Sequence, residues 1–217
     1  MSDFVLTARM CASNAEQFPD ILKLYIPPPA KVLDMTWGNG VFWKNEGCHR
    51  CLGQPSEVTF EDHAHYVWAN DLDPEKGDHH HDFQSLPLEW SQQFDAAILD
   101  PPYKLTGTKY QGDQYGNRSR GRNVVWDFYR NGIIEAKRVL RPGGILIVKC
   151  MDQVSLHKQN WVHIFVYEEA LADGFRADDL FVMTKKNARW QPHKIQRHAA
   201  KNHSFFWVFA NGGPPRI

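Results

Sequence analysis

Residues 94–103 read FDAAILDPPY, an apolar run that ends in an aspartate, two prolines and a tyrosine. An apolar run without regular polar alternation is typical of a strand covered on both faces, as in a parallel sheet. The two prolines fix the backbone and remove two N–H donors, so they end the strand rather than extend it. This stretch therefore predicts a buried parallel strand that ends at Asp100.

Similar apolar runs occur on both sides of this strand. We expect further strands at 30–35, 65–70, 144–150, 177–184 and 204–210. Helical spacing of apolar residues predicts helices at 124–140 and 161–173, the first ending before an Arg-Pro-Gly-Gly turn. Continuous apolar strands that alternate with helices predict an α/β fold, a mostly parallel sheet with helices on both faces.

Three of the expected strands end at or near an aspartate, namely Asp34, Asp71 and Asp100. Ligands of such sheets bind beyond the carboxyl ends of the strands, so these acids predict a ligand-binding rim. After Asp34, glycines in the sequence DMTWGNG would let the backbone approach a ligand and turn sharply. A dinucleotide fingerprint would need a third glycine where Trp43 stands, which disfavours a pyrophosphate ligand.

The other rim residues suit a nucleoside. The carboxylate of Asp71 could accept hydrogen bonds from ribose hydroxyls, and Asp82 with Phe83 could meet an adenine amino group and ring. The predicted cofactor-binding residues are Asp34, Thr36, Trp37, Gly38, Asn39, Gly40, Asp71, Leu72, Asp82 and Phe83.

The tetrapeptide Asp100-Pro101-Pro102-Tyr103 is the most specific chemical feature of the sequence. An amino group could donate one hydrogen to the Asp100 carboxylate and the other to the Pro101 carbonyl, which directs the nitrogen lone pair at an electrophile. Tyr103 offers a face for stacking a planar base. We therefore predict that these four residues are catalytic.

In these motifs the chain resembles the DPPY class of amino-methyltransferases, in particular the small bacterial and phage DNA adenine methyltransferases, some of which serve restriction–modification. The matching pieces are LDMTWGNG (33–40), NDLD (70–73), HDFQSLP (81–87), FDAAILDPPY (94–103) and RPGGILIVKC (141–150). The resemblance implies a Rossmann-like fold of seven strands with an antiparallel last strand, and S-adenosyl-L-methionine as the cofactor.

The resemblance also implies a site-specific DNA-methyltransferase acting on adenine N6, since enzymes of cytosine N4 more often carry serine in place of Asp100. A base in duplex DNA would have to be flipped out of the helix to reach this pocket. Methylation of cytosine carbon 5 would need a nucleophilic thiolate, but Cys150 lies inside an apolar run and is interpreted as a packing residue.

Basic residues are concentrated in the second half of the chain: residues 1–100 hold 16 acids and 6 Lys/Arg, and residues 101–217 hold 9 acids and 19 Lys/Arg. Two basic segments, 104–123 and 185–203, are predicted to contact phosphates without reading sequence. Their candidate residues are Lys104, Lys109, Arg118, Arg120, Arg122, Lys185, Lys186, Arg189, Trp190, Lys194, Arg197 and Lys201.

Three alternatives stay open: an RNA adenine-N6 methyltransferase, a DNA cytosine-N4 methyltransferase, and an inactive nucleic-acid-binding module with the same fold. A small-molecule methyltransferase would leave the two basic segments unexplained. The expected partner is double-stranded DNA, with RNA as the alternative; the sequence gives no recognition site, oligomeric state or partner endonuclease.

Length and composition predict one globular domain over 1–217, without a membrane span or signal peptide, and the resemblance implies that it is a methyltransferase domain. Four cysteines do not make a disulfide framework, so we expect a reduced, cytoplasmic protein. Cys48 and Cys51 have the spacing of zinc ligands, but His63 and His65 are closer together than such sites prefer, and we predict no metal.

Overall fold

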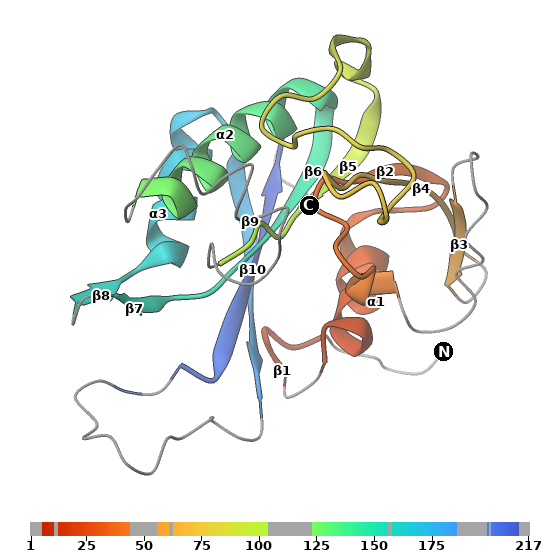
Figure 1. The fold of residues 1–217 in the computed structure, drawn as a ribbon. Helices are drawn as coiled ribbons and strands as arrows, with labels where there is room; N and C mark the ends of the chain where they lie inside the picture. The colour runs from red at the N-terminus through yellow and green to blue at the C-terminus, as the bar shows by residue number, and fades with distance from the viewer. Residues whose placement is uncertain are drawn as a thin grey trace.

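The computed structural model describes residues 6–10, 13–43, 56–60, 63–103, 123–155, 158–185, 199 and 201–212. Within this part of the chain, one sheet has eight strands in the order β1-β9-β10-β6-β5-β2-β4-β3 (Figure 1). Their bounds are β1 Arg9–Met10, β2 Ala30–Asp34, β3 Ser56–Phe60, β4 His63–Ala69, β5 Phe94–Leu99, β6 Leu140–Cys150, β9 Arg176–Thr184 and β10 His203–Ala210. A separate hairpin pairs β7 (Gln153–Ser155) with β8 (Lys158–Asn160).

The strand directions confirm an α/β sheet with an antiparallel last strand. Strands β4, β2, β5 and β6 are mutually parallel, and β10 runs antiparallel to both β6 and β9. The sheet has eight strands rather than the seven that the resemblance implies: the six strands predicted from the apolar runs are joined by β1, which adds to the edge at β9, and by β3, which pairs antiparallel with β4. The end of β9 and the start of β10 lie at the same edge as the carboxyl ends of the four parallel strands.

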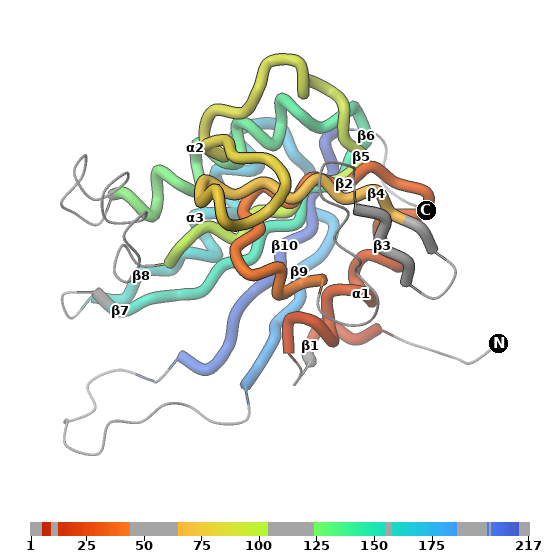
Figure 2. The backbone as a smooth tube through the Cα atoms, turned by 45° about the vertical axis from the view of Figure 1, so that its right-hand side comes forward, coloured from red at the N-terminus to blue at the C-terminus, as the bar shows by residue number. Residues whose placement is uncertain are grey.

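Helices cover both faces of the sheet (Figures 1 and 2). Helices α2 (Asn123–Val139) and α3 (Val162–Ala172) lie on one face and contact each other. Helix α1 (Asn14–Tyr25) lies on the other face beside the short helix η1 (Val41–Trp43). The sequence analysis did not predict α1, although Ser13 and Glu16 form the reciprocal capping box that marks a helix start.

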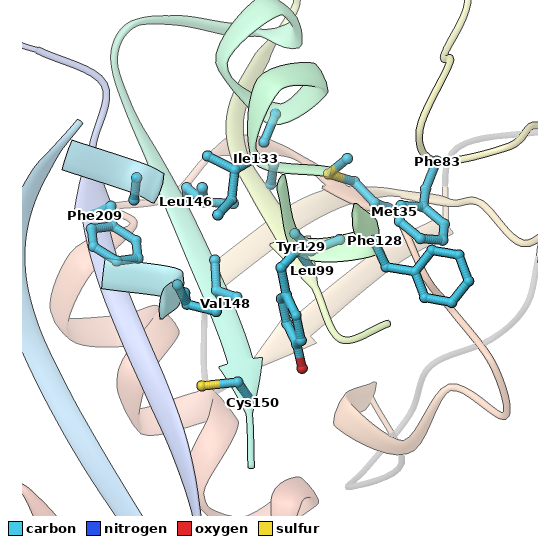
Figure 3. Close-up of a cluster of buried hydrophobic side chains, with 14 of the residues drawn as sticks. Met35, Phe83, Leu99, Phe128, Tyr129, Ile133, Leu146, Val148, Cys150 and Phe209 are labelled. Carbon is cyan, nitrogen blue, oxygen red and sulfur yellow. The ribbon is translucent and has the colours of Figure 1, made fainter. Parts of the chain in front are cut away.

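Figure 3 shows the core beneath α2, where Tyr129 and Ile133 of the helix pack against Leu146 and Val148 of β6. Cys150 is completely buried in the same cluster, and this burial raises the pKa of its thiol well above the ordinary value. A buried, protonated thiol packs rather than attacks, which agrees with its interpretation from sequence. In the described ranges no helix combines the length and apolar character needed to cross a membrane.

Candidate active site

The three acidic strand ends meet at one edge of the sheet, as the sequence predicts. The backbone N–H of Asp100 donates to the Thr36 hydroxyl over 2.8 Å, which joins the ends of β5 and β2. The backbone N–H of Gly38 donates to the Asp71 carboxylate over 2.7 Å, which joins the loop after β2 to the end of β4. The loops after β2, β4 and β5 therefore form one connected rim.

Asp34 lies underneath this rim and is completely buried. Its carboxylate accepts a hydrogen bond from the Trp43 indole over 2.7 Å and one from the backbone of Thr36 over 3.2 Å. Burial raises the pKa of Asp34 from 3.8 to about 7, because loss of hydration outweighs the two hydrogen bonds, and the nearby acids Asp100 and Asp71 add to the rise. In this position Asp34 holds the glycine loop from within.

The glycine loop, residues 35–43, needs both of its glycines. Gly38 and Gly40 each have a φ of +59°, a region that side chains rarely adopt. A Cβ on Gly40 would also lie 2.8 Å from the Trp37 ring, which stacks on Trp43 at 6.2 Å between centroids. The loop is thus shaped by the sharp turns that the sequence predicts, which are left-handed at both glycines, and by a pair of stacked indoles that the sequence does not predict.

Asp71 has both oxygens engaged with backbone groups, from Gly38 and, over 2.9 Å, from Asp73. The adjacent Asn70 is fully buried and joins three segments: its amide donates to the carbonyls of Met35 and His81 and accepts from the backbone of His81. Sequence analysis did not assign Asn70 a role. A buried amide directly before a rim acid is the signal that could have identified it.

The segment after β4 is attached to helix α2. Phe83 is buried against Phe128 at 5.7 Å between ring centroids, whereas Asp82 accepts from the backbone of Gln84 over 2.9 Å. Arg138 of α2 donates to the carbonyls of residues 86 and 87 and to the side chain of Ser91. The position of Phe83 on the rim therefore depends on contacts made by α2.

A cavity of about 170 Å³ opens at the rim, and we call it the rim cavity. It is lined by Met35, Thr36, Gly38, Asp71, Leu72, Asp73, Lys76, Phe83, Asp100 and Pro102. Five predicted cofactor residues line it, namely Thr36, Gly38, Asp71, Leu72 and Phe83. The lining does not include the other five, which are Asp34, Trp37, Asn39, Gly40 and Asp82.

The Asp100 carboxylate lies beside this cavity with a donor on each oxygen. The Tyr103 hydroxyl donates to one oxygen, and the Lys149 ammonium donates to the other over 2.8 Å. Burial and the neighbouring negative charge raise the pKa of Tyr103 well above its ordinary value, so its hydroxyl keeps its proton. Tyr103 therefore contacts Asp100 through its hydroxyl, a contact that the sequence does not predict, and the stacking role of its ring stays a prediction.

Lys149 is the main site residue that sequence reasoning missed. Register in the parallel pair β5–β6 places Leu99 beside Val148, so the next residue on each strand is Asp100 and Lys149. The ammonium group lies 5.3 to 6.0 Å from the ring centroids of Tyr103, Phe42 and Phe206. A lysine in the apolar run ILIVKC was the only signal of this arrangement.

A second cavity of about 320 Å³, which we call the lysine cavity, lies on the Tyr103 side of the tetrapeptide. It is lined by Ser13, Asn14, Val41, Tyr103, Lys149, Met151, Met183, Lys185, Lys201, Asn202, His203 and Ser204. Lys185 and Lys201, two of the predicted phosphate contacts, therefore line the same cavity as Tyr103. The other ten predicted contacts lie outside the described residues: Lys104, Lys109, Arg118, Arg120, Arg122, Lys186, Arg189, Trp190, Lys194 and Arg197.

The zinc alternative falls largely outside the described residues, because Cys48 and Cys51 are not among them. Within the ranges that the structure does describe, no three histidine, cysteine or acidic side chains are grouped as metal ligands.

Several solved structures are similar to this chain. TrmN from Thermus thermophilus has 16% identity and a TM-score of 0.52, with 89% of this chain and 48% of that chain covered. A putative DNA modification methylase, also from Thermus thermophilus and determined with S-adenosyl-L-methionine, has 16% identity and a TM-score of 0.41, with 62% and 53% covered. The PvuII cytosine-N4-specific DNA methyltransferase has 16% identity and a TM-score of 0.45, with 62% and 47% covered.

The chain thus spans about half the length of these proteins. At 16% identity, the likeness to TrmN concerns the fold alone. Among curated proteins, none matches this sequence. The N6/N4 family model of DNA methylases matches residues 94–216, which is more than half of the chain and runs from β5 past β10. The chain therefore belongs to the N6/N4 DNA methylase family.

Proposed function

We propose that this protein transfers a methyl group from S-adenosyl-L-methionine to the exocyclic N6 amino group of adenine in DNA. The observation that carries the proposal is the position of Asp100. It follows β5 and lines the rim cavity, its backbone is held by Thr36, and its carboxylate is held by Tyr103 and Lys149, which line the lysine cavity. A carboxylate held between two cavities can contact a nucleobase on one side while a methyl donor lies on the other.

The rim cavity offers groups that suit S-adenosyl-L-methionine. The left-handed turn at Gly38 lets the backbone approach a ligand, Asp71 and Asp73 present carboxylates, and Phe83 presents a buried ring. When bound, this cofactor supplies an electrophilic methyl group. The residues of the chain would bind its nucleoside and exclude water around the methyl group, which is a contribution of positioning rather than covalent chemistry.

On the target side, the amino group of the base would donate to the Asp100 carboxylate and the Pro101 carbonyl. These two acceptors orient the nitrogen and keep its lone pair directed at the methyl group. Tyr103 would stack on the flipped base, and Lys185 and Lys201 would contact the adjoining phosphates together with the rest of both basic segments. The presence of aspartate rather than serine at position 100 favours adenine over cytosine N4.

The proposal is tested by expressing the protein in a bacterial host that lacks DNA methyltransferases and mapping modified bases by single-molecule sequencing. We expect N6-methyladenine in a defined sequence context. Asp100→Ala should abolish the modification, whereas Asp127→Asn should retain it, since Asp127 is half-exposed on α2 and pairs with Arg130 there.

Each alternative has its own signature in this experiment. N4-methylcytosine in the DNA would identify the cytosine enzyme, and N6-methyladenine confined to cellular RNA would identify the RNA enzyme. A purified protein that binds DNA but releases no heat when titrated with S-adenosyl-L-methionine would indicate the inactive module. Modification that persists in Asp100→Ala would overturn the role given to the carboxylate.

A further inference from the structure

The Lys149 ammonium group has hydrogen-bonding capacity that the protein itself leaves unused. It is a buried group that lines the lysine cavity and donates to the Asp100 carboxylate over 2.8 Å. Among the residues that the structure describes, no second acceptor bonds this nitrogen. An ammonium group has three hydrogens to donate, and a buried donor without an acceptor is costly, so the cavity is suited to a ligand that brings an acceptor.

The position of this group is fixed from several sides. The rings of Phe42, Tyr103 and Phe206 surround it at 5.3 to 6.0 Å, and the opposite charge of Asp100 offsets the cost of burying it. A fixed donor reads its ligand more sharply than a flexible surface lysine, because it cannot move to suit a wrong partner.

Lys149 lines the lysine cavity, and its ammonium group bonds the Asp100 carboxylate, which lines the rim cavity. An acceptor and a donor therefore lie side by side where the two cavities adjoin the tetrapeptide. The complementary edge of a nucleobase has an amino group next to an unprotonated ring nitrogen. Adenine has this edge at N6 and N1, and cytosine has it at N4 and N3. Guanine and thymine instead have a carbonyl oxygen next to a ring N–H. The carbonyl oxygen would face the Asp100 carboxylate, acceptor against acceptor, and the ring N–H would face the Lys149 ammonium, donor against donor.

We propose that Lys149 is a specificity-determining residue that donates a hydrogen bond to the ring nitrogen adjacent to the amino group being methylated. This inference rests on the proposed function and adds to it a residue that recognises the target base. Asp100 would accept from the amino group while Lys149 tests for the neighbouring ring acceptor.

The test uses duplex oligonucleotides that contain the mapped methylation site, with the target base opposite an abasic site so that base pairing does not contribute. The target is adenine, 1-deazaadenine, which replaces N1 by C–H, or 7-deazaadenine, which keeps N1. With wild-type protein we expect kcat/KM to fall about 10- to 100-fold for 1-deazaadenine, the range for a lost hydrogen bond to a charged group. For 7-deazaadenine it should stay within a few-fold of adenine.

Lys149→Met removes the donor and should bring the ratio between adenine and 1-deazaadenine close to one. Lys201→Met is the matched control, because it removes another lysine of the same cavity and should weaken both substrates equally while keeping the ratio. If the mapped base is cytosine, the same comparison is made with 3-deazacytosine.

The outcomes separate the two proposals. Equal rates of wild-type protein on adenine and 1-deazaadenine, or an unchanged ratio in Lys149→Met, would overturn the role of Lys149 and leave methylation intact. The wild-type comparison does not depend on the folding of any variant. Absence of methylation on every base would overturn the proposed function itself.

Discussion

Replacement of Asp34 by asparagine should change how the stability of the protein depends on pH. Asp34 is completely buried beneath the rim, and its pKa is raised to about 7 in the folded protein against an ordinary value of 3.8. Asparagine keeps the shape and can still accept from the Trp43 indole, but it has no proton to lose. The variant therefore removes the titration while preserving one of the two contacts.

The sign and size of the effect follow from the two pKa values. Between pH 3.8 and about 7 the unfolded chain loses the Asp34 proton while the folded chain keeps it. Rising pH thus favours unfolding, and the loss of stability is complete once the pH passes the folded value. A difference of about three pKa units corresponds to about 4 kcal/mol, which is the upper limit of the Asp34 contribution.

Urea denaturation at pH 5 and pH 8 measures this contribution as the difference between wild type and Asp34→Asn. The variant should lose less stability than wild type on going to pH 8, by up to about 3 kcal/mol, because only the two pH units between 5 and the folded pKa of about 7 fall within this comparison. Asp127→Asn, on the exposed side of α2, should behave as wild type. If Asp34→Asn and wild type lose the same free energy between the two pH values, the assignment of a neutral buried Asp34 is wrong.

Three further variants test the contacts that hold the rim. Gly132→Ala places a Cβ 2.8 Å from the Leu99 side chain, and this overpacking should destabilise by about 1 to 3 kcal/mol in urea denaturation despite the better helix propensity of alanine. Arg138→Ala removes hydrogen bonds from α2 to the 86–91 segment and should cost about 1 to 3 kcal/mol by the same measurement. Asp71→Ala frees the glycine loop from β4 and should weaken S-adenosyl-L-methionine binding about 10-fold or more by calorimetry, with no change expected at an exposed control such as Asp127→Asn.

Most of the sheet could be predicted because its strands are apolar without interruption. The strand expected at 30–35 is β2, and the helix expected at 124–140 is α2, each within a residue or so of the structure. Helix α1 was missed because it contains Pro19 and begins only after a capping signal that was not weighed. Strand β3 has no apolar run to identify it, since Ser56–Phe60 is a mixed sequence that depends on pairing with β4.

The rim acids show both the strength and the limit of sequence reasoning. Their common edge was predictable, because parallel strands bring their carboxyl ends together. The role of each acid could not be predicted, because a carboxylate at the end of a strand can either face a cavity or lie beneath it. Asp34 is buried and accepts a hydrogen bond from the indole N–H of Trp43, and that contact depends on how the glycine loop turns back. Asp71 lines the rim cavity, as a ligand-binding acid should.

Asp100 and Lys149 come from two separate strands, β5 and β6, and they become neighbours only through the register in which these strands pair. Side chains alternate along a strand, so Asp100 shares the face of Ile98, and Lys149 shares the face of Ile147. Ile98 and Ile147 are direct partners in β5–β6 and pack in the core on the α1 side. A shift of one residue would place Lys149 on the opposite face, within the core under α2 and away from the Asp100 carboxylate. The need to pair this buried charge with Asp100 therefore helps to fix the register of the two strands, and the same register gives the proposed site its adjoining acceptor and donor.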